Sequence, residues 1–152
     1  MMPISLYQQG IDLERYASRL NALVVSSYDS DRSNHQRFLS SQFPNSRVDV
    51  SNYDDLTRQL MHSQYDVLVL DNDAFFVDKS PALDSLPGLG EFIDRKRIIV
   101  TAAIADQGLV ERVNTLGATF IEKGKWKTLE QTVKDVSGKY QVDIKAAWTW
   151  CQ

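Results

Sequence analysis

The chain has 152 residues, of which 43% are hydrophobic and 24% are charged, and it carries a formal net charge of -3. A chain of this size and apolar content can bury one core without disulfides or metals, so a single globular domain is expected. The acidic balance argues against direct binding to nucleic acid or anionic lipid. The one cysteine, Cys151, excludes an internal disulfide and a cysteine zinc cluster. The first residues lack a signal-peptide pattern and no run approaches the ~18 apolar residues of a membrane span, so we expect a cytoplasmic protein.

An apolar face at helical spacing precedes the first predicted strand. It consists of Leu13, Tyr16, Ala17 and Leu20. The apolar run at 22–25 that follows is typical of a strand. We therefore expect residues 1–20 to form a helical extension or linker ahead of a domain that spans residues 21–138. The extension is also consistent with the end of an upstream kinase domain, in which case the chain is a fragment of a hybrid sensor kinase.

Two predicted helices flank the second strand. Ser30 or Asp31 is expected to cap the first helix, because both residue types accept hydrogen bonds from the free amides at a helix start. A short strand over 47–50 follows, and the next helix is expected to begin at Asn52 or Asp54. The inward face of that helix is expected to consist of Leu56, Leu60 and Met61.

A continuous apolar run at 67–70 predicts a third strand that is covered on both faces. A loop over 72–80 separates it from the least regular element, a helix that Pro87 and Gly88 are expected to break or shorten. The apolar positions of this helix are Leu83, Leu86, Leu89, Phe92 and Ile93.

The pattern of a strand followed by a helix then repeats twice. Strands are expected over 97–101 and 119–122, and Gly117 is expected to end the helix between them. The last two helices have their inward faces at Leu109, Val110, Val113 and Leu116, and at Leu129, Val133 and Val136. Five such repeats predict an α/β fold with a (βα)5 doubly wound parallel sheet, because right-handed crossovers place helices on both faces.

Polar residues follow four of the five predicted strands. Ser26 and Ser27 follow the first strand, Asp71 the third and Lys123 the fifth, while Thr101 ends the fourth. The carboxyl ends of parallel strands meet in one crevice, which is where such sheets bind ligands. We therefore expect these side chains to lie close together.

Three of these residues lie in motifs with a recognisable spacing. YDVLVLD, RIIVTA and FIEK contain Asp71, Thr101 and Lys123, which are 30 and 22 residues apart. In these features the region from Asn21 to Val136 resembles the response-regulator receiver family, which has the CheY-like, flavodoxin-like fold. The resemblance implies that Asp71 is a phosphoacceptor nucleophile, that Thr101 hydrogen-bonds a phosphoryl oxygen, and that Lys123 supplies a cation. Phe120 matches the aromatic switch of the family.

The acidic pair with which receivers hold Mg²⁺ is missing from this sequence. Ser26 and Ser27 stand at the matching positions, 45 and 44 residues before Asp71. Neutral hydroxyls are poor ligands for a hard cation. By resemblance Asp71 and the backbone carbonyl of Asp73 remain as metal ligands, so a Mg²⁺ site is expected to be weak, and no other cofactor is expected.

Other residues near the predicted site also depart from the family pattern. Gly124 replaces the proline after the lysine, and Ala-Phe at 74–75 replaces a Met-Pro pair. Asp29 and Asp31 are open to two interpretations, either as acids that reach the site or as a turn residue and a helix cap.

With fewer acids nearby, Lys123 is expected to pair with Asp71 in the absence of phosphate. We therefore expect an atypical receiver, or pseudo-receiver, which is not an enzyme and which signals by protein contact through a face within 106–136. Its expected partners are a histidine kinase, a phosphotransfer protein or an output domain. Two alternatives stay open: a receiver that accepts phosphate from a histidine kinase, and a flavodoxin-like small-molecule binder.

The histidines and tryptophans are interpreted as structural or contact residues. His35 and His62 lack metal-ligand spacing, which favours surface or helix-face positions. Trp126 is expected to pack under the last helix. The C-terminal tail over 139–152 is an edge strand or a linker, and its two tryptophans, Trp148 and Trp150, are expected to contact another domain or subunit, which leaves a dimer open.

Overall fold

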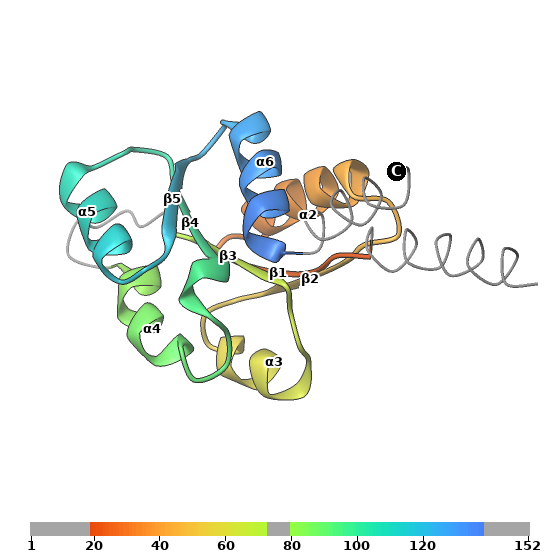
Figure 1. The fold of residues 1–152 in the computed structure, drawn as a ribbon, viewed down its shortest axis with the longest axis horizontal. Helices are drawn as coiled ribbons and strands as arrows, with labels where there is room; N and C mark the ends of the chain where they lie inside the picture. Colours follow the sequence, from red (N-terminus) through yellow and green to blue (C-terminus); the bar gives the residue numbers. More distant parts are fainter. Residues whose placement is uncertain (1–18, 73–79, 139–152) are drawn as a thin grey trace, which may run out of the picture.

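A five-stranded parallel sheet lies at the centre of the computed structural model, which describes residues 19–72 and 80–138 (Figure 1). The strands are β1 (Asn21–Val25), β2 (Arg47–Ser51), β3 (Val67–Asp71), β4 (Ile98–Ala102) and β5 (Thr119–Glu122). Their order is β2-β1-β3-β4-β5, and all four pairings are parallel. The predicted α/β fold with a doubly wound parallel sheet is confirmed, and β3 occupies its centre.

Helices cover both faces of the sheet (Figure 1). They are α2 (Asp29–Gln42), α3 (Leu56–His62), α4 (Pro81–Leu89), α5 (Gln107–Thr115) and α6 (Trp126–Ser137), with a short 3-10 helix η1 (Arg95–Arg97) before β4. Helices α2 and α6 pack on one face, where Leu39 and Val133 are fully buried, and α3, α4 and α5 pack on the other, where Leu86 and Val113 are fully buried.

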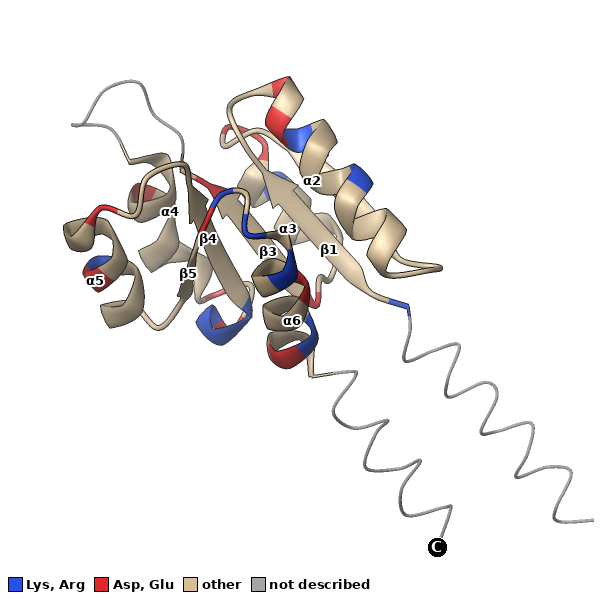
Figure 2. Ribbon diagram, turned by 90° about the horizontal axis from the view of Figure 1, so that it is seen from above, with Lys and Arg blue, Asp and Glu red and all other residues tan. Residues whose placement is uncertain are grey.

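Alternation along the central strand explains the two cores. In β3, Leu68 and Leu70 join the core under α3, α4 and α5, whereas Val67 and Val69 join the core under α2 and α6. All four side chains are fully buried, and each such burial stabilises the fold by roughly 1.5–3 kcal/mol. The charged residues lie mainly on the helices and loops, and the inner strands carry few of them (Figure 2).

Helix α2 does not begin as predicted. Its N-cap is Tyr28, whose side chain makes no capping hydrogen bond, and Ser30 and Asp31 lie inside the first turn. The prediction that either residue caps this helix is therefore wrong. The cause is tertiary, because the carboxylate of Asp31 is bound to Lys123 of the loop after β5 and does not turn back to its own helix.

Helix α3 begins at Leu56, later than predicted, because Asn52 closes a turn ahead of it by accepting a 2.9 Å hydrogen bond from the amide of Asp55. Leu56 and Leu60 are buried as predicted. Met61 is 69% exposed, so its assignment to the inward face is wrong. In a helix of only two turns, Leu56 and Leu60 fill the inward stripe and the next residue points elsewhere.

Helix α4 is short, as Pro87 and Gly88 predicted, and Ser80 caps its start by accepting from the amide of Leu83. Its end at Leu89 leaves Phe92 outside the helix and 42% exposed, so the helical assignment of Phe92 and Ile93 is wrong. The predicted extension over 1–20, except for Arg19 and Leu20, and the predicted tail over 139–152 lie outside the described residues. Within 19–72 and 80–138, no helix is long and apolar enough to span a membrane.

Candidate functional site

The register of the sheet brings the predicted site residues to one edge. Asp71 at the end of β3 is directly opposite Thr101 of β4, and Thr101 is opposite Ile121 of β5. Lys123 follows the last residue of β5 and remains attached to the sheet, because its amide donates a 2.8 Å hydrogen bond to the carbonyl of Ala102. The structure therefore places Asp71, Thr101 and Lys123 together, as the sequence predicted.

The carboxylate of Asp71 is enclosed by donors. Its side chain has no exposed surface. Oδ2 accepts a 2.8 Å hydrogen bond from the hydroxyl of Ser26, and Oδ1 accepts a 3.3 Å hydrogen bond from the hydroxyl of Thr101. A buried carboxylate is stable only when such partners and a cation satisfy it, and the pocket supplies both.

Lys123 supplies the cation. Its Nζ lies 3.1 Å from Oδ1 and 3.2 Å from Oδ2 of Asp71. The same Nζ lies 3.1 Å from Oδ2 of Asp31, at the start of α2. The side chains of Lys123 and Asp31 are 19% and 21% exposed, so the ammonium bridges a buried carboxylate and a half-buried one. Sequence patterns did not distinguish this role of Asp31 from a helix cap.

Ser26 organises the loop between β1 and α2. Its amide donates to the carbonyl of Ser51, and its hydroxyl oxygen accepts a 3.2 Å hydrogen bond from the amide of Tyr28. Its carbonyl accepts a 2.5 Å hydrogen bond from Nη1 of Arg32, which is ion-paired with Asp29. Ser26 therefore fixes the loop between β1 and α2 next to the Asp71 carboxylate.

The two serines at the missing acidic positions therefore differ. Ser26 is fully buried and bonded to Asp71, whereas Ser27 is exposed to solvent. Asp29 also points away from the site, with a side chain that is 94% exposed. Of the two acidic residues in the first turn of α2 that were considered for the site, Asp31 reaches it and Asp29 does not.

Two further residues hold the end of β3, and the sequence analysis missed both. The hydroxyl of Tyr53 donates a 2.5 Å hydrogen bond to the backbone carbonyl of Asp71. The side-chain oxygen of Asn72 accepts from the hydroxyl of Ser80 at 2.8 Å and from the amide of Ala82 at 3.2 Å, which ties the start of α4 to the site. An aromatic hydroxyl in a loop at the carboxyl edge of the sheet is the one signal that would have indicated Tyr53.

The donor set does not fit Mg²⁺, the metal that the resemblance to receivers implies. A hard cation of this size needs carboxylate or carbonyl oxygens that are free to bind it. Here the Ser26 hydroxyl donates its proton to Asp71, and the ammonium of Lys123 lies between the two nearby carboxylates. Among residues 19–72 and 80–138, no cluster of three or more His, Cys, Asp or Glu side chains could hold a metal. Asp73, the other predicted ligand, lies outside the described residues.

The remaining aromatic residues pack beside the site. Of the two positions predicted for the histidines, surface or helix face, His35 takes the buried face of α2 and is 2% exposed, whereas His62 is exposed. The Nδ1 of His35 donates a 2.8 Å hydrogen bond to the carbonyl of Asp31. Trp126 packs at the start of α6 against the rings of His35 and Phe38, with centroids 5.3 Å and 4.7 Å away, which confirms its packing role. Phe120 is half-buried against the core under α3, α4 and α5.

Solved structures with this fold include receiver domains. The receiver domain of a response regulator from Clostridium thermocellum matches with a TM-score of 0.67 and 14% identity, over 81% of this chain and 98% of that one. The receiver domain of a DNA binding response regulator from Colwellia psychrerythraea 34H matches with a TM-score of 0.64 and 20% identity, over 76% and 96%. The chemotaxis protein CheY4 of Vibrio cholerae matches with a TM-score of 0.65 and 15% identity, over 78% and 98%. No protein-family model and no curated protein matches the sequence. At these identities the likeness establishes the CheY-like fold.

Proposed function

We propose that the chain is a receiver-like domain of two-component, or phosphorelay, signal transduction that acts by protein contact, with weak or absent phosphorylation at Asp71. The fold of the similar receiver domains supports the class. The arrangement of Asp71, Thr101 and Lys123 supports the location of the site. The replacement of the acidic pair by Ser26 and Ser27 supports the loss of efficient phosphorylation.

The observation that carries this proposal is that both oxygens of the Asp71 carboxylate are already bound and shielded from solvent. Phosphoryl transfer to a carboxylate requires an oxygen lone pair in line with the phosphorus atom and charge neutralisation at the transferring group. Each oxygen of Asp71 already accepts a hydroxyl hydrogen bond and contacts the ammonium of Lys123, and the side chain has no exposed surface. Attack by Asp71 therefore requires the pocket to open first.

Within this proposal the pocket residues keep the geometry of a signalling switch without its metal chemistry. Lys123 pairs with Asp71 in the absence of phosphate, Thr101 bonds the same carboxylate, and Phe120 reports the state of the pocket to the adjacent helices. Mg²⁺ binds weakly at most, because Lys123 competes with it for both carboxylates. The domain is a cytoplasmic protein without enzymatic activity, and its partner is a histidine kinase, a phosphotransfer protein or an output domain that contacts the face within 106–136.

Chemical phosphorylation followed by intact-protein mass spectrometry tests the proposal. The domain is incubated with Mg²⁺ and acetyl phosphate beside the Asp71→Asn variant and beside a receiver domain that gains one phosphoryl group under the same conditions. The expected result is little or no phosphoryl adduct on the wild-type chain while the positive control is fully modified. An adduct that reaches the extent of the positive control on the wild type and is missing from Asp71→Asn contradicts the proposal.

A second candidate function is an ordinary receiver that accepts phosphate from a histidine kinase. The convergence of Asp71, Thr101 and Lys123 at one edge of the sheet favours it, because these residue types match the family pattern. The adduct on Asp71 that contradicts the first proposal is the result that this candidate predicts.

A further inference from the structure

We propose that Lys123 is the built-in cation of the pocket and that Asp31 is the positioning residue that holds it there, so that an ammonium group takes the place of a divalent metal ion. This inference rests on the proposed function, because it explains how the Asp71 pocket is neutralised and closed without Mg²⁺. It assigns a role to Asp31, which lies outside the motifs that resemble the receiver family.

The geometry around Nζ of Lys123 is that of a bound cation. An ammonium group carries three N–H donors, and three carboxylate oxygens, two from Asp71 and one from Asp31, lie 3.1–3.2 Å from it. Asp71 binds the ammonium from the buried end of the site, and Asp31 adds a second carboxylate at the more exposed end. A lysine with both partners leaves its place less often than a lysine that is bound to Asp71 alone.

Asp31 can hold Lys123 because its own place in the structure is fixed. The first turn of α2 is anchored by Arg32, whose guanidinium donates to the carbonyl of Ser26. The carbonyl of Asp31 accepts a hydrogen bond from the buried ring of His35, one turn further along. That ring packs on Trp126, in the same chain segment as Lys123. Helix α2 is thus joined to the segment from Lys123 to Trp126 by one ion pair and by the aromatic contacts of His35 and Phe38 with Trp126.

This arrangement excludes a metal by competition. A divalent ion that binds Asp71 has to displace the ammonium from both carboxylates, and the buried ammonium repels it until then. In the proposed pocket, therefore, the metal-free state is set by Lys123 and Asp31 as well as by the loss of the acidic pair.

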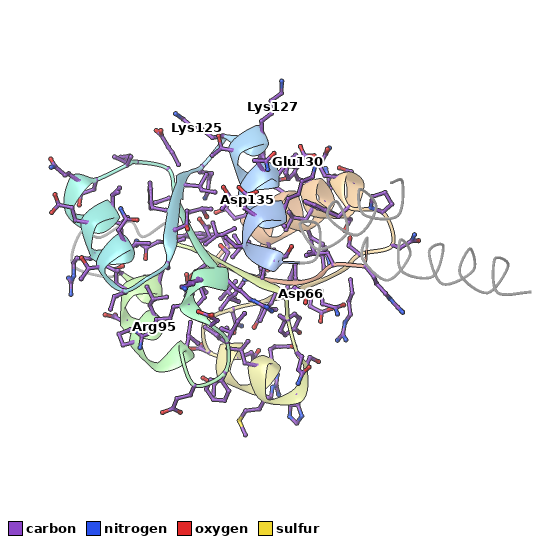
Figure 3. All side chains as sticks on the ribbon, in the orientation of Figure 1. Asp66, Arg95, Lys125, Lys127, Glu130 and Asp135 are labelled. Atoms are coloured by element: carbon purple, nitrogen blue, oxygen red, sulfur yellow. The ribbon has the colours of Figure 1, made fainter. Side chains whose placement is uncertain are left out.

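Amine labelling of individual lysines measures how firmly Lys123 is held. The wild-type chain is treated with a limiting amount of an N-hydroxysuccinimide ester, and the modification of each lysine is followed by peptide mass spectrometry. Lys125 and Lys127 extend from the start of α6 into solvent and serve as internal references (Figure 3). Lys123 is expected to react more slowly than both references.

The Asp31→Asn variant is expected to raise the labelling rate of Lys123 relative to Lys125 about fivefold, which corresponds to about 1 kcal/mol of lost ion pairing. Asp29→Asn is the matched control, because Asp29 is an exposed acid two residues away that pairs with Arg32 and not with Lys123. It is expected to leave the labelling of Lys123 unchanged. Equal labelling of Lys123 in the wild type and in Asp31→Asn overturns the proposal.

Adding a metal ion to a variant without Lys123 tests whether the ammonium takes the place of a divalent cation. In Lys123→Met the two carboxylates lose their cation, so Mn²⁺ at ten times its dissociation constant is expected to raise the melting temperature by about 3–6 °C. The wild type is expected to show no such rise, and the double variant Asp31→Asn/Lys123→Met is expected to lose it. A rise in the wild type, or a rise that persists in the double variant, contradicts the proposal. If Lys123→Met does not fold, the labelling result and the wild-type Mn²⁺ titration still decide the question.

The two proposals fail separately. A phosphoryl adduct on wild-type Asp71 that reaches the extent of the positive control overturns the proposed function whatever the labelling shows. Unchanged labelling in Asp31→Asn with no adduct on the wild type sinks the role of Asp31 and leaves the proposed function in place.

Discussion

The two sides of the Asp71 pocket are built differently. On one side, Asp71, Thr101 and Lys123 stand at or next to the ends of neighbouring strands, and the register of the sheet fixes them. On the other side, Ser26 and Asp31 come from a loop and the first turn of a helix, and their side chains reach the pocket through tertiary contacts. The strand side brings a carboxylate, a hydroxyl and an ammonium group together, while the helix side adds a second hydroxyl and a second carboxylate. Under the proposed function, this arrangement keeps the residue types of a phosphoacceptor site without the acidic pair that would hold its metal.

Removing the cation that both sides share is expected to have the largest effect. Lys123→Met leaves the fully buried Asp71 carboxylate without a countercharge, which is expected to lower the free energy of unfolding by about 3–5 kcal/mol. Urea denaturation measures this change. The exposed Lys125→Met serves as the control and is expected to stay within about 0.5 kcal/mol of the wild type. A loss below about 1 kcal/mol for Lys123→Met means that Asp71 does not depend on this lysine.

The hydroxyls on the two sides are expected to differ in strength. Ser26→Ala removes a 2.8 Å hydrogen bond to a buried carboxylate and is expected to cost about 1.5–3 kcal/mol. Thr101→Val keeps the shape of the side chain and removes a 3.3 Å bond to the same group, so it is expected to cost less, about 0.5–1.5 kcal/mol. Chemical denaturation of both variants checks the order. If Thr101→Val lowers the free energy of unfolding more than Ser26→Ala does, the hydroxyl of Ser26 is not the stronger of the two partners of Asp71.

The hydrogen bond between Tyr65 and Asp49 lies away from the pocket, and its contribution to stability is expected to depend on pH. Burial and the 2.7 Å hydrogen bond to Asp49 raise the pKa of Tyr65 to about 12. A raised pKa favours the protonated form in the folded state, so its contribution is complete below pH ~10 and is lost between pH ~10 and ~12. At pH 11 the expected loss is about 1.4 kcal/mol. The difference in stability between the wild type and Tyr65→Phe isolates this titration, and a difference that is constant from pH 9 to 12 contradicts it.

The smallest effect on stability is expected for the carboxylate of Asp31, the more exposed partner of Lys123. Asp31→Asn removes a half-buried ion pair and is expected to cost about 0.2–1 kcal/mol, because solvent screens Asp31 more than Asp71. Added salt is expected to reduce this difference. Thermal unfolding at low and high ionic strength measures it. A cost as large as that of Lys123→Met indicates that Asp31 supports the fold and not only the position of the lysine.

The sequence predicted the strand side of the pocket better than the helix side for a physical reason. Apolar runs locate strands, and parallel strands bring their ends together, so Asp71, Thr101 and Lys123 could be placed without a structure. The direction of Asp31 depends on where α2 begins, and the loop before that start is tied to distant parts of the chain through Ser26, which contacts Asp71 and Ser51. Local rules left Asp31 open between a helix cap and an acid that reaches the site, because they contain no information about Lys123.

Predictions at the ends of helices failed for the same kind of reason. Met61 and Phe92 have apolar side chains at helical spacing, yet each lies where a short helix has no further core to cover. Tyr53 was missed because its hydroxyl bonds the backbone of β3, and the sequence signals this contact only by placing an aromatic hydroxyl in a loop at the carboxyl edge of the sheet. Periodicity locates the elements, while the ends and polar contacts require the assembled fold.

The closure of the pocket around Asp71 is tested most directly by beryllofluoride, which forms a phosphoryl-like adduct on accessible acceptor carboxylates. Backbone amide NMR spectra of the wild type and of Asp71→Asn are recorded while beryllofluoride is added at millimolar Mg²⁺. We expect no saturable shift of the signals of Asn72, Ala102 and Lys123. A saturable shift in the wild type that Asp71→Asn abolishes contradicts the closed pocket and identifies Asp71 as a working phosphoacceptor.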